Sequence, residues 1–338
     1  MATTSHHIII PGQVIANTTN EEESFLRGHG TYLENVDESI GGADGGQSNI
    51  QAEEEADQTP ITNQNLIASV TGTITRTNKL IQVTQPNAPY AAQTGDPVIG
   101  RVTSLTSSKW NISLSLSHST STSSNAGLPL TGINLPDGMQ RMRTSADALS
   151  MREVLSEGDI ISAEVRMVQG QSSGLGGGNI VLHARSVRCG KLENGCFVMV
   201  PSWLIARRKK HFVVLGGNGE NDGFDGVKIE VLLGCNGGVW IQRAMMELEE
   251  MGESGGLSEE VQRIRKGHAK RPNTIEERIV CARVKNAIEA LKMTHCRITP
   301  DNITMVVKAS ANLGFDVVDM IRPEVIVKIT ECTRNIPK

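Results

Sequence analysis

The chain has 338 residues, of which 38% are hydrophobic and 21% are charged. This length is enough for two or three cores of ordinary domain size, which excludes a single small module. The formal net charge of −4 by itself argues against a nucleic-acid partner, but the charge is segregated. Residues 1–60 carry eleven acids and one base, so residues 61–338 carry 32 bases and 26 acids, a net charge of +6. The body of the protein is therefore basic.

The cysteine and aromatic content indicates in which compartment the protein is found and how it can contact nucleic acid. The six cysteines form no C-x-x-C pair and the N-terminus lacks the segments of a signal peptide, so we expect free thiols in a reducing compartment. No apolar run approaches the roughly 18 residues that a membrane-spanning helix requires, so we expect a soluble protein. Ten aromatic residues are too few for a dense base-stacking platform. Any contact with nucleic acid must therefore depend on charge and backbone amides.

Residues 1–85 are expected to form a small β domain. An extended segment at 7–15 precedes the block at 27–32, and β-branched residues at 66–83 surround a turn at Thr77 and Asn78, which predicts a hairpin. Residues 37–59 are rich in Gly, Gln and Glu and have almost no large apolar side chains. Such a stretch cannot bury enough surface to offset its ordering entropy, so we expect a disordered acidic insertion there.

Residues 90–188 have the pattern of a β-barrel. Apolar residues alternate with polar ones at 98–102 and 110–116, a third run follows at 128–130, and two more alternating runs occupy 161–167 and 180–184. A capped helical run at 144–155 precedes the fourth of these strands. Five strands with one helix before the fourth is the order of an OB-fold barrel, which closes its sheet and leaves no exposed edge.

Residues 191–338 are predicted to be α+β. Strands are expected at 227–231 and 239–241, and apolar residues spaced three to five apart over 275–291 indicate an amphipathic helix. Pro300 suits the first position of a helix. Pro323 is expected to interrupt the preceding structure before residues 325–330. Residues 216–226 and 251–271 are expected to be surface loops.

Several short blocks follow one another along most of the chain. They are PG at 11–12, RGHGTY at 27–32, LIASV at 66–70, NKLI at 78–81, GDPVIGRV at 95–102, NLP at 134–136, EGDIISAEV at 157–165, LHARS at 182–186 and GCNG at 234–237. Each block alone is weak. Their collinear combination resembles the RNA-exosome cap subunits of the ribosomal RNA-processing protein 4 type, with insertions as the main departure.

This resemblance implies a multidomain fold: a β-rich N-terminal domain, an S1-type OB-fold barrel and an α+β KH-type domain. It implies a non-catalytic subunit that binds single-stranded RNA, stabilises the exosome ring and guides RNA for 3′–5′ processing and degradation, ribosomal RNA maturation included. The implied partners are the ring subunits and RNA, with no cofactor, metal, membrane or small-molecule substrate. The implied location is the nucleus and nucleolus, and also the cytoplasm.

Two other functions fit parts of the sequence. A free single-strand RNA-binding protein associated with ribosomes or translation would have the same barrel and the same charge. A phosphorolytic exonuclease with attached RNA-binding domains would need a catalytic core for which the chain is too short. Converging carboxylates and a G-x-S-x-G nucleophile turn are both missing from the sequence, so we expect no enzyme activity.

The strongest electrostatic feature is a run of seven bases against one acid, Glu193, over residues 182–212. Phosphate contact is one interpretation, because each neutralised phosphate releases counterions. A solvated turn and a nuclear-targeting patch are the competing interpretations. The candidate RNA-binding residues are Arg185, Arg188, Lys191, Arg207, Arg208, Lys209 and Lys210, together with Arg141 and Arg143 before the predicted helix. Trp110 alternates with apolar residues, so we expect it in the barrel core, and we expect His118 to be inert.

Gly234, Cys235, Asn236 and Gly237 have the letters of the KH G-x-x-G loop, which clamps a nucleic-acid backbone. The flanking segments are strand-like, however, and Asn-Gly between strands is the chief signal of a type I′ hairpin turn. We therefore favour a structural turn with positive φ at Asn236 and Gly237, and expect it at the surface.

The remaining candidate block contains a histidine between two glycines. No Asp, Glu or Cys lies at ligand spacing, and the glycines permit positive φ, so a tight turn is favoured over a base or a metal ligand. The resemblance implies a role in docking on the ring for Arg27, Gly28, His29, Gly30, Thr31 and Tyr32.

Overall fold

The computed structural model describes residues 2–17, 25–35, 64–85, 90–115, 125–133, 148–169, 179–186, 188–216, 223–245 and 259–334. The chain divides into two compact units, Met1–Ala88 and Pro89–Lys338. The predicted disordered insertion at 37–59, Arg141, Arg143 and His118 lie outside the described residues.

The first unit consists of two small antiparallel-rich sheets. One sheet has the strand order β1-β6-β7-β3 and the other the order β2-β5-β4. The predicted hairpin is confirmed as β6 and β7, with Asn78 at φ 54° in the turn between them. The strands are β1 (Ala2–Ile9), β2 (Val14–Asn17), β3 (Leu26–Arg27), β4 (Thr31–Asn35), β5 (Gln64–Ala68), β6 (Gly72–Thr77) and β7 (Leu80–Thr84).

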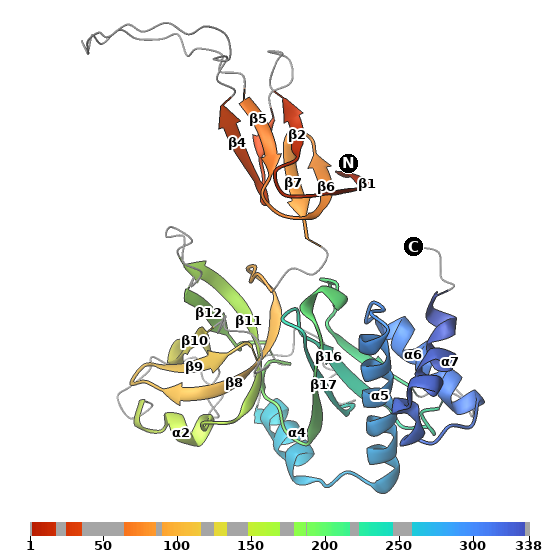
Figure 1. The fold of residues 1–338 in the computed structure, drawn as a ribbon. Coiled ribbons are helices and arrows are strands. Elements are labelled where there is room, and N and C mark those ends of the chain that lie inside the picture. The colour runs from red at the N-terminus through yellow and green to blue at the C-terminus, as the bar shows by residue number, and fades with distance from the viewer. Residues whose placement is uncertain are drawn as a thin grey trace, which may run out of the picture. The chain divides into compact units, whose positions relative to one another are not determined.

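The second unit begins with the predicted barrel (Figure 1). Its sheet has the order β12-β10-β9-β8-β11-β13, and an additional pairing of β11 with β12 closes it. Trp110 is fully buried and its Nε1 donates to the Leu155 carbonyl at 3.2 Å, so its predicted place in the core is confirmed. The elements are β8 (Pro97–Leu105), β9 (Lys109–Ser113), β10 (Asn125–Pro129), α2 (Met151–Val154), β11 (Ile160–Gln169), β12 (Asn179–His183) and β13 (Gly190–Lys191).

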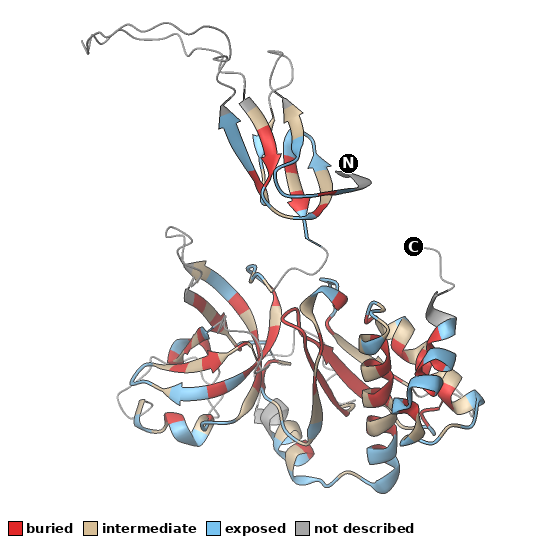
Figure 2. Cartoon of the chain, viewed as in Figure 1, coloured by how far each residue is buried: buried red, intermediate tan, exposed pale blue. Residues whose placement is uncertain are grey.

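The rest of the second unit is a four-stranded antiparallel sheet covered by helices. The sheet order is β14-β17-β16-β15, and buried residues line its face toward α5 (Figure 2). Thr274 and Glu277 form a capping box that starts α5, and Pro300 starts α6 as predicted. The elements are β14 (Gly195–Met199), β15 (Phe212–Leu215), β16 (Ile229–Leu233), β17 (Gly238–Arg243), α4 (Glu259–Lys270), α5 (Ile275–Met293), α6 (Pro300–Asn312) and α7 (Pro323–Arg334).

One loop prediction for this region is wrong, and a second is wrong only in placing the loop at the surface. Within residues 251–271, which we expected to be a loop, residues 259–270 form α4. This helix has few apolar residues and contains Gly267, a residue of low helix propensity, so its sequence resembles that of a polar loop. In the range 216–226, the described residues 216 and 223–226 form no helix or strand, as predicted, and residues 217–222 lie outside the described part of the chain. Phe224 is only 1% exposed and packs into the core with residues of α5 and α6, so this part of the loop is not at the surface.

Candidate nucleic-acid interface

The barrel and the KH-type domain each have a core, and a small apolar cluster joins the two domains. A cluster formed by Ile99 of β8, Leu232 of β16 and Trp240 of β17 is buried between them, with partly buried neighbours on both sides. Because these apolar side chains leave water only when the two domains are in contact, the domains stabilise each other.

The loop between β16 and β17 is part of the junction. The Asn236 side chain is 4% exposed, and its Nδ2 donates to the carbonyls of Ile99 at 2.7 Å and Leu114 at 2.9 Å. Its Oδ1 accepts from the Ile99 amide at 3.2 Å. Cys235 is 5% exposed and its amide donates to the Pro97 carbonyl at 2.9 Å. Three of the four hydrogen-bonding positions of one amide side chain are therefore occupied by the barrel backbone.

The hairpin predicted here is confirmed, but its conformation and its surroundings differ from expectation. The Gly237 amide donates to the Gly234 carbonyl and the Gly234 amide to the Gly238 carbonyl, and only Gly237 has positive φ, at 89°. This is a three-residue hairpin loop, a type I turn followed by a left-handed residue, in place of a type I′ turn. The expected surface position is wrong, because the barrel covers the loop. Burial also raises the pKa of Cys235 to about 12, so its thiol stays protonated.

A second contact joins the domains through Arg207 and Asp96. The guanidinium donates from Nε to Oδ1 at 2.8 Å and from Nη2 to Oδ2 at 3.0 Å, and Nη2 also donates to the Ala91 carbonyl at 2.9 Å. Tyr90 donates its hydroxyl to the same carboxylate at 3.0 Å. Burial alone would raise the pKa of Asp96, but the hydrogen bonds from Arg207, the Gln93 amide and Tyr90 outweigh it and hold this pKa below its usual value. Arg207, a candidate RNA-binding residue, is thus engaged within the protein.

The residues that follow Arg207 line a cavity of about 580 Å³ at the same junction. We define the basic cleft as Arg188, Arg208, Lys209 and Lys210, which line this cavity together with Gly95, Pro97, Glu164, Ser186, His211 and Phe212. Arg208, Lys209 and Lys210 are exposed, and among the described residues no acid forms an ion pair with them. The Arg188 guanidinium lies 5.7 Å from the centre of the Phe212 ring and 3.8 Å from Glu230. Buried Leu204 and Ile205 precede this basic segment and anchor it.

The other candidate bases lie elsewhere. Lys191 pairs with Asp159 at 3.2 Å and with Glu193 at 2.9 Å, outside the basic cleft. Arg185 donates to the Thr131 carbonyl at 2.9 Å. The structure therefore brings four of the predicted bases together and ties Arg207 to the barrel. No sequence pattern indicates the contacts of Asp96 and Asn236, because Arg207 is 111 positions from Asp96 and Ile99 is 137 positions from Asn236. Tyr90 is only six positions from Asp96, but no motif marks this pair.

In the first unit, the block at 27–32 forms a turn between β3 and β4. Gly30 has φ 74°, and the Thr31 hydroxyl donates to the Gly28 carbonyl at 2.8 Å. A Cβ at Gly28 would lie 2.5 Å from the Ile81 carbonyl oxygen, so only glycine fits there. His29 is exposed while its carbonyl accepts from the Val83 amide at 2.9 Å. This geometry agrees with the turn interpretation.

Neither a metal-binding cluster nor a membrane-spanning helix is found in the described part of the chain. The described residues contain no group of three or more His, Cys, Asp or Glu side chains that could hold a metal ion. No helix among them is long and apolar enough to cross a membrane.

Comparison with known proteins gives matches along most of the chain. Residues 89–167 match the family described as "RRP4, S1 domain", and residues 195–245 match a KH domain family. The chain is 30% identical to the exosome complex component RRP4 of Bos taurus over 329 residues, which cover 97% of this chain and 89% of the relative. It is 30% identical to the Arabidopsis thaliana homolog over 92% of this chain and 82% of the relative. It is 32% identical to the Saccharomyces cerevisiae protein over 70% of this chain and 51% of the relative.

Proposed function

The chain belongs to the exosome component RRP4 family, and from that membership we propose that it is a non-catalytic, RNA-binding cap subunit that stabilises the exosome ring and guides RNA toward 3′–5′ processing and degradation. Ribosomal RNA maturation is among the pathways it serves. Its partners in this proposal are the ring subunits and single-stranded RNA. It acts in the nucleus and nucleolus and also in the cytoplasm.

The basic cleft is the observation that supports RNA binding most directly. Arg208, Lys209 and Lys210 extend from a buried anchor into solvent without acidic partners among the described residues, beside Arg188, which lies over the Phe212 ring. Phosphates on a flexible strand can replace the counterions of such a cluster without base-specific contacts. The cleft lies between the proposed S1-type domain (residues 90–188) and the proposed KH-type domain (residues 191–338), so a strand there would contact both.

The first unit, proposed as a domain of residues 1–85, supplies the contact with the ring. Its turn at 27–32 is fixed by backbone pairing to β5 and β7 while the side chains of Arg27 and His29 face solvent. The large apolar side chains exposed on this unit are Ile8, Ile10, Val14, Leu26, Tyr32, Leu33 and Leu80. In this proposal the ring covers exposed apolar side chains of this unit and so removes them from water.

Assembly is tested by affinity purification of the tagged full chain from cells, followed by identification of the subunits and measurement of the mass of the complex. We expect a large hetero-oligomer that contains the ring subunits and degrades RNA only through other subunits. A free RNA-binding protein would instead elute near the mass of one chain without ring subunits, and that result would overturn the proposal.

Binding at the basic cleft is tested by the double variant Lys209→Gln and Lys210→Gln, which removes two charges and keeps both side chains polar, although one bond shorter. Affinity for single-stranded RNA should fall similarly for all sequences, and the slope of log K against log salt should fall by about 1.4, at ~0.7 per lost phosphate contact. The control variant, Lys285→Gln with Lys328→Gln, removes the same charge from α5 and α7. Equal slopes in the two variants would exclude the basic cleft as an RNA contact.

A further inference from the structure

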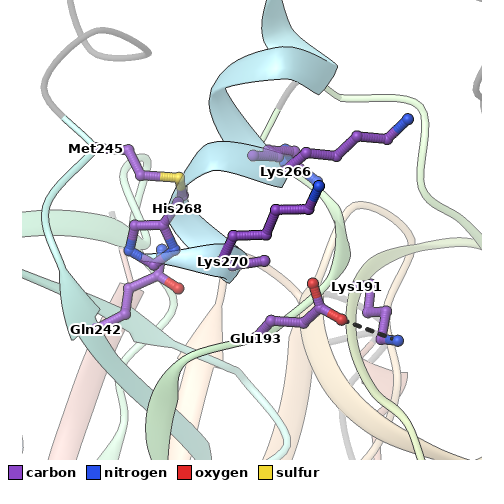
Figure 3. Close-up of a pocket in the computed structure, with 9 residues that line it drawn as sticks. Lys191, Glu193, Gln242, Met245, Lys266, His268 and Lys270 are labelled. Carbon is purple, nitrogen blue, oxygen red and sulfur yellow. Dashed lines mark ion pairs between the residues drawn. The ribbon is translucent and has the colours of Figure 1, made fainter. Parts of the chain in front are cut away.

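A second cavity, of about 500 Å³, lies between α4 and the edge of the KH-type sheet (Figure 3). It shares no residue with the basic cleft. We call it the α4 pocket, and its lining residues are Lys191, Glu193, Gln242, Met245, Arg265, Lys266, His268, Ala269 and Lys270. Four of these side chains are basic and one is acidic, so the charged side chains that line the pocket sum to +3.

Some of the charged side chains of the pocket are paired within the protein, and others are free to bind a ligand. Glu193 pairs with Lys191 at 2.9 Å, and Lys191 also pairs with Asp159 at 3.2 Å, so the one acid is neutralised. Lys266 and Lys270 are exposed, and within the described part of the chain neither forms an ion pair. They are one helical turn apart, and Figure 3 shows their ammonium groups extending in the same direction. Two unneutralised charges therefore lie at the mouth of the pocket.

The helix that carries these lysines is held firmly against the sheet edge. Asn194 Nδ2 donates to the carbonyl of His268 at 3.1 Å and to that of Arg271 at 2.7 Å, which satisfies two carbonyls at the end of α4. Arg265 Nη1 donates to the Cys189 carbonyl at 2.8 Å. The guanidinium is thus fixed in orientation before any ligand arrives, so little side-chain entropy is lost when one binds.

The wall of the pocket also contains an unsatisfied polar group. His268 is 7% exposed, and its Nε2 has no hydrogen-bond partner among the described residues. Burial, followed by the charge of Arg243, lowers the pKa of His268, so its ring is neutral at pH 7. A buried polar atom without a partner is unfavourable, and a ligand hydroxyl or a water in the pocket can relieve it.

We propose that the α4 pocket is a second phosphate-binding site, which holds a phosphate group between Lys266, Lys270 and Arg265. A phosphate has several oxygens that accept from different donors at once, whereas a carboxylate offers only two. The volume of the pocket leaves room for part of a nucleoside next to the phosphate. The inference rests on the proposed RNA-binding function where the phosphate belongs to an RNA strand, and it is independent of that function where the phosphate belongs to a small molecule.

The test uses the full chain and the double variant Lys266→Gln and Lys270→Gln, with Lys285→Gln and Lys328→Gln again as the control. One arm measures the affinity for a single-stranded RNA of about 20 nucleotides over a range of salt concentrations. In a second arm, inorganic phosphate and a nucleoside monophosphate are each titrated into the protein, and calorimetry measures the heat of binding. A third arm titrates an acidic peptide, since a carboxylate-rich protein is the competing class of ligand. Melting temperatures establish that all variants are folded.

For the RNA arm we expect the slope of log K against log salt to fall by about 1.4 in the pocket variant. If variant and wild type bind equally at 1 M salt, the variant should then bind RNA about 25-fold more weakly than the wild type at 0.1 M salt. The control should match the wild type. If only the binding of phosphate and nucleotide is lost, the site is a phosphate site for small molecules and the inference stands in that form. Loss of peptide binding alone would overturn it.

The outcome also separates this inference from the proposed function. If the pocket variant behaves like the control in the RNA and phosphate arms while the basic-cleft variant loses affinity, the α4 pocket is not a phosphate site but the proposed function survives. If the wild type binds no RNA and the pocket still binds phosphate, the proposed RNA-binding function is wrong, but the inference that the α4 pocket is a phosphate site stands.

Discussion

Gly237→Val is expected to lower the free energy of unfolding by about 3 to 5 kcal/mol, the sum of backbone strain and steric overlap. Gly237 has φ 89°, which β-branched residues adopt poorly. A Cβ at this position would also lie 2.1 Å from the Val200 carbonyl oxygen. That oxygen belongs to backbone that pairs with Gly237 itself, since the Val200 amide donates to the Gly237 carbonyl at 2.9 Å. The neighbour therefore cannot move aside without breaking the pairing.

The control for this experiment is Gly226→Val. Gly226 has φ 74°, but a Cβ at this position would have no atom within 4 Å, so the substitution adds strain without overlap. Its expected cost is about 1 to 2 kcal/mol. Urea denaturation of both variants gives the comparison. Equal losses would mean that the loop backbone relaxes away from Val200 and that the close packing at the junction is not obligatory.

Asn236→Ala is expected to cost about 3 to 5 kcal/mol, because it removes the side chain that pairs with three buried barrel groups. These groups are the amide and carbonyl of Ile99 and the carbonyl of Leu114. The measurement is urea denaturation together with hydrogen exchange at the Ile99 amide, which should lose protection.

The matched control is Asn286→Ala, which also removes a buried asparagine. Asn286 Nδ2 donates to a single acceptor, the Val317 carbonyl, at 2.6 Å. Its loss should cost about 1 to 3 kcal/mol. If Asn236→Ala costs no more than Asn286→Ala, the loop does not hold the barrel to the KH-type domain.

The sequence predicted those parts of the fold that depend on local periodicity. The alternation of apolar residues around Trp110 and Ile112 indicated the barrel strands, and the spacing over 275–291 indicated α5. Helix α4 was missed because its side chains are mostly polar and its attachment depends on Asn194, a residue 65 positions before the helix begins, whose role no local pattern reveals.

The candidate site was predictable only in part, for the same reason. The run of bases at 207–210 was visible in the sequence, but the engagement of Arg207 by Asp96 joins residues 111 positions apart. The hairpin at 234–237 was likewise predicted from its letters, whereas its burial depends on a barrel strand 137 positions earlier. Charge and turn chemistry are local properties, while burial is decided by which distant segments meet.

The shared cluster of Ile99, Leu232 and Trp240 has a thermodynamic consequence for the whole chain. β8 contributes Val98 and Val102 to the barrel core and Ile99 to this cluster, so the cluster joins the barrel core to the separate core of the KH-type domain. Heat should therefore melt the two domains in one cooperative transition. The first unit has a core of its own, built on Ile9, Ala68 and Val83, and should give a second, smaller transition. In a calorimeter, a protein with three recognisable domains would thus behave as two.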